Sequence, residues 1–266
     1  MRGIDLYEGA GTVDWAALGD VGFAIVKATE GATTRDARFA GHWPAIKKAG
    51  IIRGAYHFFY AASSTPQAQA ESFLTTVGTL VEGDLPPVLD IEEASLQDVA
   101  PATVIAHAHA WLDYVERRLR TPQGKPLRAI VYTNFDTWQR LGNPEGFTDY
   151  PLWIASPGGG EPDIPVPFGR NDWLLRQTAF DQEHVGVSER VDLDISNTFE
   201  RGSSGARVRD VQQRLKSLLA ESTDPGLVDG TFGPKTDSAV RAFQRTRRLT
   251  VDGIVGLKTW VELIWS

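Results

Sequence analysis

The segment Pro87-Val88-Leu89-Asp90-Ile91-Glu92 places two acidic residues inside an otherwise apolar run. Its branched apolar side chains predict a buried β-strand. Because side chains alternate between the two faces of a strand, Asp90 and Glu92 point to the same side of the sheet. Two neighbouring acids in a protein interior are costly unless water solvates them or a reaction uses them. The segment therefore predicts both a core strand and a candidate site.

Similar runs recur through the first 200 residues and give eight predicted strands. They are Gly3–Tyr7, Phe23–Thr29, Ile52–Phe59, Pro87–Glu92, Ala129–Asn134, Leu152–Ala155, Leu174–Thr178 and Val191–Ile195. Helical patterns at Asp36–Ala49, Pro66–Val77 and Ala102–Leu119 separate the early strands, and this order is typical of a parallel sheet. The pattern predicts an α/β fold, a TIM-like (β/α) barrel over residues 1–200. Beyond residue 134 the connections are rich in Gly, Pro and Asp, so we expect the second half of the barrel to be irregular.

Further acids lie on the first and last predicted strands. Catalytic groups of such barrels lie at the carboxyl ends of the strands. Asp5 lies near the end of the first strand, and Asp192 and Asp194 lie similarly on the last. Because the first and last strands are neighbours in a closed barrel, we expect these acids to converge with Asp90 and Glu92 on one mouth.

An acidic cluster of this kind suits glycoside hydrolysis. One carboxylic acid must protonate the leaving oxygen while other negative groups stabilise the developing cation. Like-charged neighbours raise a carboxyl pKa, which would keep Glu92 protonated as the acid. From these residues alone, a structural alternative stays open, in which Asp90 and Glu92 form salt bridges at a strand end.

The composition changes at Arg201-Gly202-Ser203-Ser204-Gly205, which predicts a flexible linker over residues 201–206. An amphipathic helix, Val208–Leu219, follows it. The turn sequence that starts at Val228 returns at Val251, and each copy leads into a helical pattern. We therefore expect a second, small all-α domain over residues 207–266.

The composition also excludes several classes of function. The net charge is −7, with 16 Lys+Arg against 27 Asp+Glu in residues 1–200 and 11 against 7 in residues 201–266. The acidic body disfavours nucleic acid as a partner, and no apolar run approaches the roughly 18 residues of a membrane span. Cysteine is absent, which excludes disulfides and thiol catalysis. His107 and His109 face apart on a predicted helix, so we expect neither a metal site nor a cofactor.

A collinear series of short motifs over residues 2–199 resembles glycoside hydrolase family 25, the Chalaropsis-type lysozymes. The series is Gly3-Ile4-Asp5, Gly11 with Asp14-Trp15, Lys27-Ala28-Thr29-Glu30-Gly31, Gly54-Ala55-Tyr56-His57-Phe58, Leu89-Asp90-Ile91-Glu92, Tyr132-Thr133-Asn134, Leu152-Trp153-Ile154-Ala155 and Val191-Asp192-Leu193-Asp194. The resemblance implies an irregular barrel that hydrolyses the β-1,4 bond between N-acetylmuramic acid and N-acetylglucosamine in peptidoglycan.

The resemblance also implies roles for individual residues. Glu92 is the general acid, and Asp90 orients or stabilises the substrate's 2-acetamido group or the intermediate. Asp5 and Asp192 complete the acidic cluster. The nucleophile stays open between a carboxylate and the acetamido oxygen, and we favour the latter. The expected substrate-binding residues are Tyr56, Tyr132, Trp153, Gln177 and Asp194. Core packing is the alternative for the first four, and the family often has Asn in place of Asp194.

The tail resembles the peptidoglycan-binding domain of the three-helix type, through Val211-Gln212, Asp229-Gly230, Phe243-Gln244, Asp252-Gly253 and Thr259-Trp260. This resemblance implies an enzyme that is anchored to bacterial peptidoglycan. We also expect the protein to be a monomer. Met1 is followed at once by a predicted strand, so we expect synthesis in the cytoplasm without a signal peptide. We then expect a phage endolysin that reaches the wall through a permeabilised membrane, or else export by a non-Sec route. A non-catalytic wall-binding protein and an amidase or peptidase are the rival functions.

Overall fold

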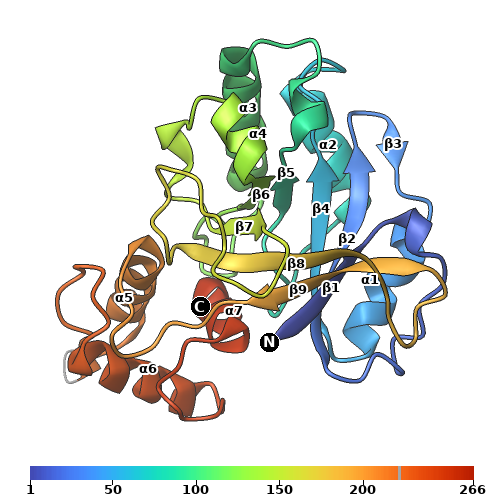
Figure 1. Ribbon diagram of the computed structural model, residues 1–266. Coiled ribbons are helices and arrows are strands. Elements are labelled where there is room, and N and C mark those ends of the chain that lie inside the picture. Colours follow the sequence, from blue (N-terminus) through green and yellow to red (C-terminus); the bar gives the residue numbers. More distant parts are fainter. Residues whose placement is uncertain (221–222) are drawn as a thin grey trace.

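The computed structural model describes residues 1–220 and 223–266, which fold into a barrel and a helical tail packed against it (Figure 1). The strands are β1 (Arg2–Leu6), β2 (Val21–Glu30), β3 (Thr34–Arg35), β4 (Ile52–Phe58), β5 (Val88–Asp90), β6 (Ile130–Asn134), β7 (Leu152–Ala155), β8 (Trp173–Glu183) and β9 (Arg190–Ser196). The α-helices are α1 (Phe39–Lys48), α2 (Pro66–Val77), α3 (Pro101–Arg118), α4 (Phe135–Arg140), α5 (Ala206–Leu218), α6 (Pro234–Thr246) and α7 (Leu257–Trp265). Short 3₁₀ turns occur at η1 (Glu8–Ala10), η2 (Glu93–Leu96) and η3 (Glu145–Phe147).

Eight of the strands close into a barrel. The order is β1-β9-β8-β7-β6-β5-β4-β2, and β1 pairs with β2 to complete the ring. The short strand β3 lies outside the ring as an antiparallel partner of β2. The predicted α/β barrel is thus confirmed.

The last strand, β9, runs against the other barrel strands, which the strand pattern did not predict, whereas β8 pairs parallel with β7. β8 pairs antiparallel with β9, and β9 pairs antiparallel with β1. β8 extends to Glu183, five residues beyond the predicted end at Thr178. Its last four residues are exposed and three of them are polar, so the alternating apolar pattern ends before the strand does, and the extension pairs with β9.

Helices cover the barrel unevenly. α1, α2 and α3 follow the early strands as predicted, whereas α4 is short and no α-helix lies between β7 and β8. The loop after β7 is instead held by the buried side chain of Arg176. Its guanidinium donates to the carbonyl oxygens of Ser156 at 2.7 Å, Gly158 at 2.8 Å and Gly160 at 2.6 Å. The irregular second half expected from the sequence is therefore organised by one arginine.

The repeated turn in the tail has a structural explanation. Gln212 on α5 donates to the carbonyl of Thr231 at 3.0 Å and accepts from the amide of Gly230 at 2.8 Å. Gln244 on α6 makes the equivalent pair of contacts with Ile254 and Gly253, both at 3.0 Å. Each Asp-Gly turn is thus held by a buried glutamine of the preceding helix, and the positive φ angles of both glycines, 78° and 74°, explain the glycine.

The predicted flexible linker at residues 201–206 is instead hydrogen-bonded along its length. Gly202 donates to the carbonyl of Phe232 at 3.1 Å, and Gly205 donates to that of Gly230 at 2.9 Å. α5 already begins at Ala206. A Gly- and Ser-rich composition removes side-chain constraints, but here the exposed backbone groups find partners in the tail.

The tail packs against the end of the barrel at which the parallel strands begin (Figure 1). The indole of Trp265 donates to the carbonyl of Asp84, which precedes β5, at 2.7 Å. The buried guanidinium of Arg207 donates to the carbonyl of Thr148, which precedes β7, at 2.9 Å. Within the described residues, no helix is both long enough and apolar enough to cross a membrane.

Candidate active site

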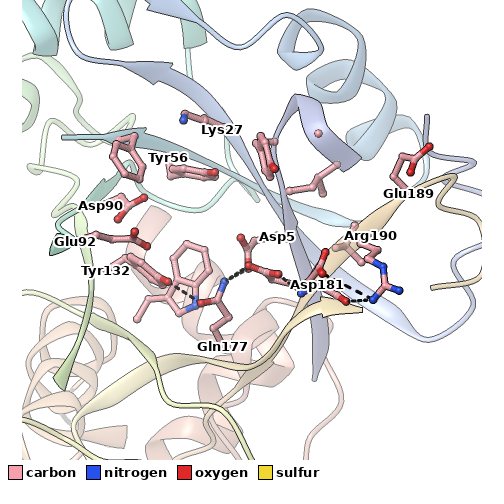
Figure 2. A pocket seen from close by; sticks show the side chains of 17 residues that line it. Asp5, Lys27, Tyr56, Asp90, Glu92, Tyr132, Gln177, Asp181, Glu189 and Arg190 are labelled. Carbon is pink, nitrogen blue, oxygen red and sulfur yellow. Dashed lines mark hydrogen bonds and ion pairs between the residues drawn. The ribbon is translucent and has the colours of Figure 1, made fainter. Parts of the chain in front are cut away.

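A groove of about 440 Å³ opens at the end of the barrel where the parallel strands finish (Figure 2). The four acids predicted as catalytic all line it, and four of the five predicted substrate-binding residues join them. These eight residues are Asp5, Asp90, Glu92, Asp192, Tyr56, Tyr132, Trp153 and Gln177. The fifth, Asp194, does not line the groove.

Asp90 and Glu92 reach the groove floor from β5 and from the turn after it. The strand ends at Asp90, two residues before the predicted end. Glu92 nevertheless keeps an extended backbone, with φ −120° and ψ −176°, so the alternation of side chains continues past the strand. The Ser95 hydroxyl holds this bend, because it accepts from the Glu92 amide at 3.1 Å and donates to the Phe59 carbonyl at 2.6 Å.

The environment of this pair favours the retention of a proton. Asp90 is 5% exposed, and its Oδ1 has no hydrogen-bond partner within the protein. Burial raises the pKa of Asp90 well above its usual value, and the neighbouring Glu92 raises it further. Burial also raises the pKa of Glu92. Lys27, which pairs with Glu30 and lies over the Phe58 ring, opposes both shifts. The two carboxyls can therefore hold a proton at a pH where an exposed carboxyl would have lost it.

The other two acids meet across the seam of the barrel. Asp5 on β1 lies opposite Asp192 on β9 in the strand register. The amide nitrogen of Gln177 donates to both, at 2.7 Å to Asp5 and 2.9 Å to Asp192. The amide oxygen of Gln177 accepts from the Tyr132 hydroxyl at 2.6 Å. Because β9 is antiparallel, its first residues, and not its last, reach the mouth.

Asp194 lies beneath the groove rather than on its wall. It is two residues further along β9 than Asp192, so it points to the same side but deeper into the barrel. Its side chain is 2% exposed, and its Oδ1 accepts from the Trp153 indole at 2.9 Å. Burial raises the pKa of Asp194 to about 7. The structure thus gives Asp192, and not Asp194, access to a bound substrate.

Three aromatic residues form one wall of the groove. Tyr132 and Trp153 lie on adjacent strands with their rings edge to face, 4.5 Å apart. Tyr56 and Tyr132 are 8% and 6% exposed, and burial raises the pKa of both phenols well above the usual value. Both therefore stay neutral and keep a hydroxyl proton to donate. These residues pack in the core and also line the groove, so core packing and substrate binding do not exclude each other as their roles.

The groove also contains residues that the sequence analysis did not identify. They are Leu6, Tyr7, Gly9, Lys27, Phe58, Asp181, Glu189, Arg190 and Val191. A charged Lys27 within an apolar core strand was a usable signal. The hairpin between β8 and β9 gave none, because its polar residues resemble an ordinary loop, although the amide of Asp181 donates to Asp192 at 2.7 Å.

The described residues hold no group of three His, Cys, Asp or Glu side chains placed to bind a metal ion. His57 has a structural role in the core. Its Nδ1 lies 2.8 Å from the Thr29 hydroxyl, and its Nε2 lies 3.0 Å from Oε1 of Gln69. Because that oxygen can only accept, Nε2 carries the proton and Nδ1 accepts from Thr29. Burial lowers the pKa of His57 to about 4.

Comparison with known proteins places this geometry among the lysozymes. The chain is similar to an autolytic lysozyme of Clostridium acetobutylicum, with 31% identity over 97% of this chain and 77% of that protein. It is also similar to Lysozyme M1 of Streptomyces globisporus, with 30% identity over 74% of this chain and 68% of that protein. The crystal structure of a bacterial lysozyme from Streptomyces coelicolor matches with a TM-score of 0.67 and 28% identity, over 74% of this chain and 92% of that one.

The family matches divide the chain as the fold does. Residues 204–263 match a peptidoglycan binding domain, which covers the helical tail. Residues 4–178 match Glycosyl hydrolases family 25, which covers β1 to the middle of β8 and includes Asp5, Asp90 and Glu92. The barrel, its acidic groove and these matches agree, and the chain belongs to glycosyl hydrolases family 25.

Proposed function

We propose that this protein is an N-acetylmuramidase, which hydrolyses the β-1,4 bond between N-acetylmuramic acid and N-acetylglucosamine in peptidoglycan. The observation that carries the proposal is the pair of the buried Asp90 and the half-buried Glu92 on the groove floor, with Asp5 and Asp192 on the opposite side. Burial favours a proton on this pair, and a glycosidic oxygen needs such a proton as it leaves. The lysozymes to which the chain is similar support the choice of substrate.

Glu92 donates its proton to the glycosidic oxygen while the bond from that oxygen to the anomeric carbon breaks. The acetamido oxygen of the same sugar then attacks the anomeric carbon. Asp90 accepts from the acetamido N–H through its free Oδ1, which aligns that group and stabilises its positive charge. Water attacks next, and the Glu92 carboxylate takes the proton of that water. Both acids return to their starting states.

The test uses purified cell walls. Glu92→Gln should lower the release of new reducing ends by at least about 10²-fold, because general acid catalysis contributes on that order. Glu93→Gln is the matched control, since the adjacent Glu93 is exposed and pairs with Arg140 at the surface. Mass analysis of the wild-type products should find N-acetylmuramic acid at the reducing end. Equal rates for wild type and Glu92→Gln, or new free amines without reducing ends, would contradict the proposal.

We further propose that the tail anchors the enzyme to the wall. The match of residues 204–263 to a peptidoglycan binding domain supports this role. The inactive Glu92→Gln protein should sediment with walls, and a fragment of residues 1–200 should sediment less at the same concentration. Circular dichroism must first establish that the fragment folds, because removing the tail exposes the Asp84 and Thr148 carbonyls that contact it. Equal binding by a folded fragment would refute the anchoring role.

We also propose that the protein acts as an endolysin, synthesised in the cytoplasm and admitted to the wall when the membrane is permeabilised. A cutting barrel joined to a wall-binding tail supports this use, and the absence of cysteine makes folding independent of an oxidising compartment. Cells that express the protein should stay intact until a permeabilising agent is added and should then lyse. Lysis without permeabilisation would instead favour an exported enzyme.

A further inference from the structure

A second cavity, of about 470 Å³, lies between the tail and the end of the barrel at which the parallel strands begin. Helices α5 and α7 of the tail lie against this end (Figure 1) and form one side of the cavity, and the segments before β6 and β7 form the other. Its size falls within the range of about 300–1,000 Å³ that is typical of small-molecule sites. The acidic groove opens at the opposite end of the barrel, so this cavity is not part of the catalytic site.

The cavity is cationic, although the whole chain has a net charge of −7. Four basic and two acidic side chains line it. The two acids already have partners, since Asp210 pairs with Arg207 at 2.5 Å and Asp149 pairs with Arg128 at 3.6 Å. Within the described residues Arg214 has no acidic partner, and its guanidinium donates to the Ile264 carbonyl at 3.0 Å. The cavity therefore has positive charge that the protein does not balance.

The cations of the cavity also repel one another. Burial lowers the pKa of Lys125 on the barrel side, and the neighbouring Arg214 lowers it further. Burial likewise lowers the pKa of Arg214, while Asp210 opposes this shift and Arg128 adds to it. A bound anion would relieve this repulsion.

The guanidinium of Arg207 is incompletely paired as well. Arg207 is 1% exposed, and its terminal nitrogens contact Asp210 and the Thr148 carbonyl. Its Nε is buried and has no hydrogen-bond partner among the described residues. A buried donor without an acceptor costs free energy, so such groups in folded proteins call for an explanation. An acceptor bound in the cavity that Arg207 lines would supply the missing partner.

The rest of the cavity wall is mainly apolar, and this decides between the classes of anion. Trp260 and Leu263 on α7 and Pro151 before β7 belong to this part. A phosphate-rich polymer would leave the apolar surface unused. A short peptide with carboxylates and methyl side chains would contact both the cations and the apolar wall. The stem peptides of peptidoglycan, which contain alanine and glutamate, have this composition.

We propose that the cavity between the barrel and the tail binds the carboxylates of a peptidoglycan stem peptide. Arg214 from the tail and Lys125 from the barrel donate to the peptide, and its methyl groups lie against Trp260 and Leu263. Because both sides contribute, the barrel takes part in wall binding as well as in cleavage. This inference rests on the proposed wall anchoring, and it names the ligand and the barrel residue that the anchoring uses.

Titration calorimetry of the full-length protein with the peptide N-acetyl-L-Ala-γ-D-Glu-L-Lys-D-Ala measures the affinity. Arg214→Gln should weaken binding at least about tenfold, the size expected for a lost hydrogen bond between charged groups. Lys125→Gln should weaken it about fivefold, because a partly exposed ion pair contributes less. Arg245→Gln is the matched control, since it makes the same change of charge on the exposed side of α6 and should bind as wild type does. Wild-type affinity in Arg214→Gln or in Lys125→Gln overturns the shared site.

Two other ligands test the chemistry of the anion. The same peptide with both carboxyl groups amidated should bind at least about tenfold more weakly than the free acid. Glycerol phosphate, which represents the phosphate polymers of cell walls, should also bind more weakly than the peptide. An amidated peptide that binds equally well would exclude carboxylate recognition, and glycerol phosphate that binds as tightly as the peptide would overturn the choice of a peptide.

A measurement on the wild type covers the case in which a variant fails to fold. In ¹⁵N-labelled protein, the indole N–H signal of Trp260 should shift when the peptide is added, and that of Trp153 in the acidic groove should stay in place. Trp260→Phe and Trp153→Phe assign the two signals. A shift of Trp153 alone would place the peptide in the groove and overturn the proposal.

The failure of this inference differs from that of the anchoring proposal. If the protein sediments with walls but does not bind the peptide, the anchoring proposal stands and this inference fails. If it neither sediments with walls nor binds the peptide, both fail.

Discussion

Replacing Asp194 with asparagine should stabilise the folded protein at neutral pH. Asp194 is 2% exposed and lies beside other acids, and burial raises its pKa from 3.8 to about 7. Asparagine fits the same contacts, because its oxygen can accept from the Trp153 indole, now 2.9 Å from Oδ1. Its amide group can donate toward Asp5, where a second carboxylate now raises the pKa of Asp5. The substitution therefore removes a buried charge and leaves the packing intact.

The sign and size of the gain follow from the protonation of Asp194. The folded state binds this proton more tightly than the unfolded state, so its contribution to stability is fully present below about pH 4 and is lost as the pH rises to about 7. Each pKa unit corresponds to about 1.36 kcal/mol, so the loss in the wild type reaches up to about 4 kcal/mol. Asparagine does not titrate. The difference in the free energy of unfolding should thus be small at pH 4, grow through pH 5 and 6, and level off near pH 7.

Urea unfolding of both proteins between pH 4 and pH 8 measures this difference. Asp181→Asn is the control, because the Asp181 side chain is exposed at the groove rim and should change little at any pH. A gain for Asp194→Asn of the same size at pH 4 and pH 8 would show that the charge of Asp194 is not its source. A variant less stable than wild type at pH 8 would refute the reasoning altogether.

Three other perturbations test the rest of the structure. Asp84→Asn leaves the buried guanidinium of Arg53 without its ionic partner at 2.8 Å and should lower the free energy of unfolding in urea by about 3–5 kcal/mol. Asp20→Asn breaks an exposed ion pair and should cost less than about 1 kcal/mol, so equal losses would contradict the role of burial. His57 has a folded pKa of about 4, so its contribution to stability is present above pH 6.5 and falls by up to about 3 kcal/mol as the pH drops to 4. In His57→Gln, the free energy of unfolding in urea should lack this decrease between pH 6.5 and pH 4. Trp265→Phe removes the hydrogen bond to the Asp84 carbonyl and should destabilise the tail by about 1 kcal/mol, seen as an earlier loss of tail signal in thermal unfolding, and unchanged unfolding would argue against a docked tail.

The alternation of side chains predicted the direction of Asp90 and Glu92 correctly, although the strand ends sooner than expected. The prediction survives because the chain stays extended to Glu92. Alternation also put Asp192 and Asp194 on one side of the last strand. It could not say which of them reaches the mouth, because that depends on the direction of the strand and its register against β1. The alternation of side chains along a strand is the same whether the strand runs parallel or antiparallel to its neighbour.

The contacts between the barrel and the tail were beyond the reach of the sequence. Arg207 is 1% exposed, yet an arginine at the start of an amphipathic helix ordinarily lies in solvent. Its guanidinium is instead held by the Thr148 carbonyl, which belongs to the barrel and precedes β7. The Gly- and Ser-rich segment before Arg207 was predicted to be flexible because its composition gives no sign of its hydrogen-bond partners. Those partners lie in turns more than twenty residues away.

The position of the tail bears on how the enzyme meets its substrate. The tail lies where the parallel strands begin, and the groove opens where they end. With the tail bound to the wall as proposed, the groove faces away from the glycan strand to which the tail is bound. Each molecule then cuts a neighbouring glycan strand, and the height of the barrel sets the distance between the bound strand and the cut strand. Because the connecting segment is hydrogen-bonded, a longer connection would not simply extend the reach. The rate in intact walls should therefore depend on the spacing of the glycan layers, whereas the rate on soluble fragments should not.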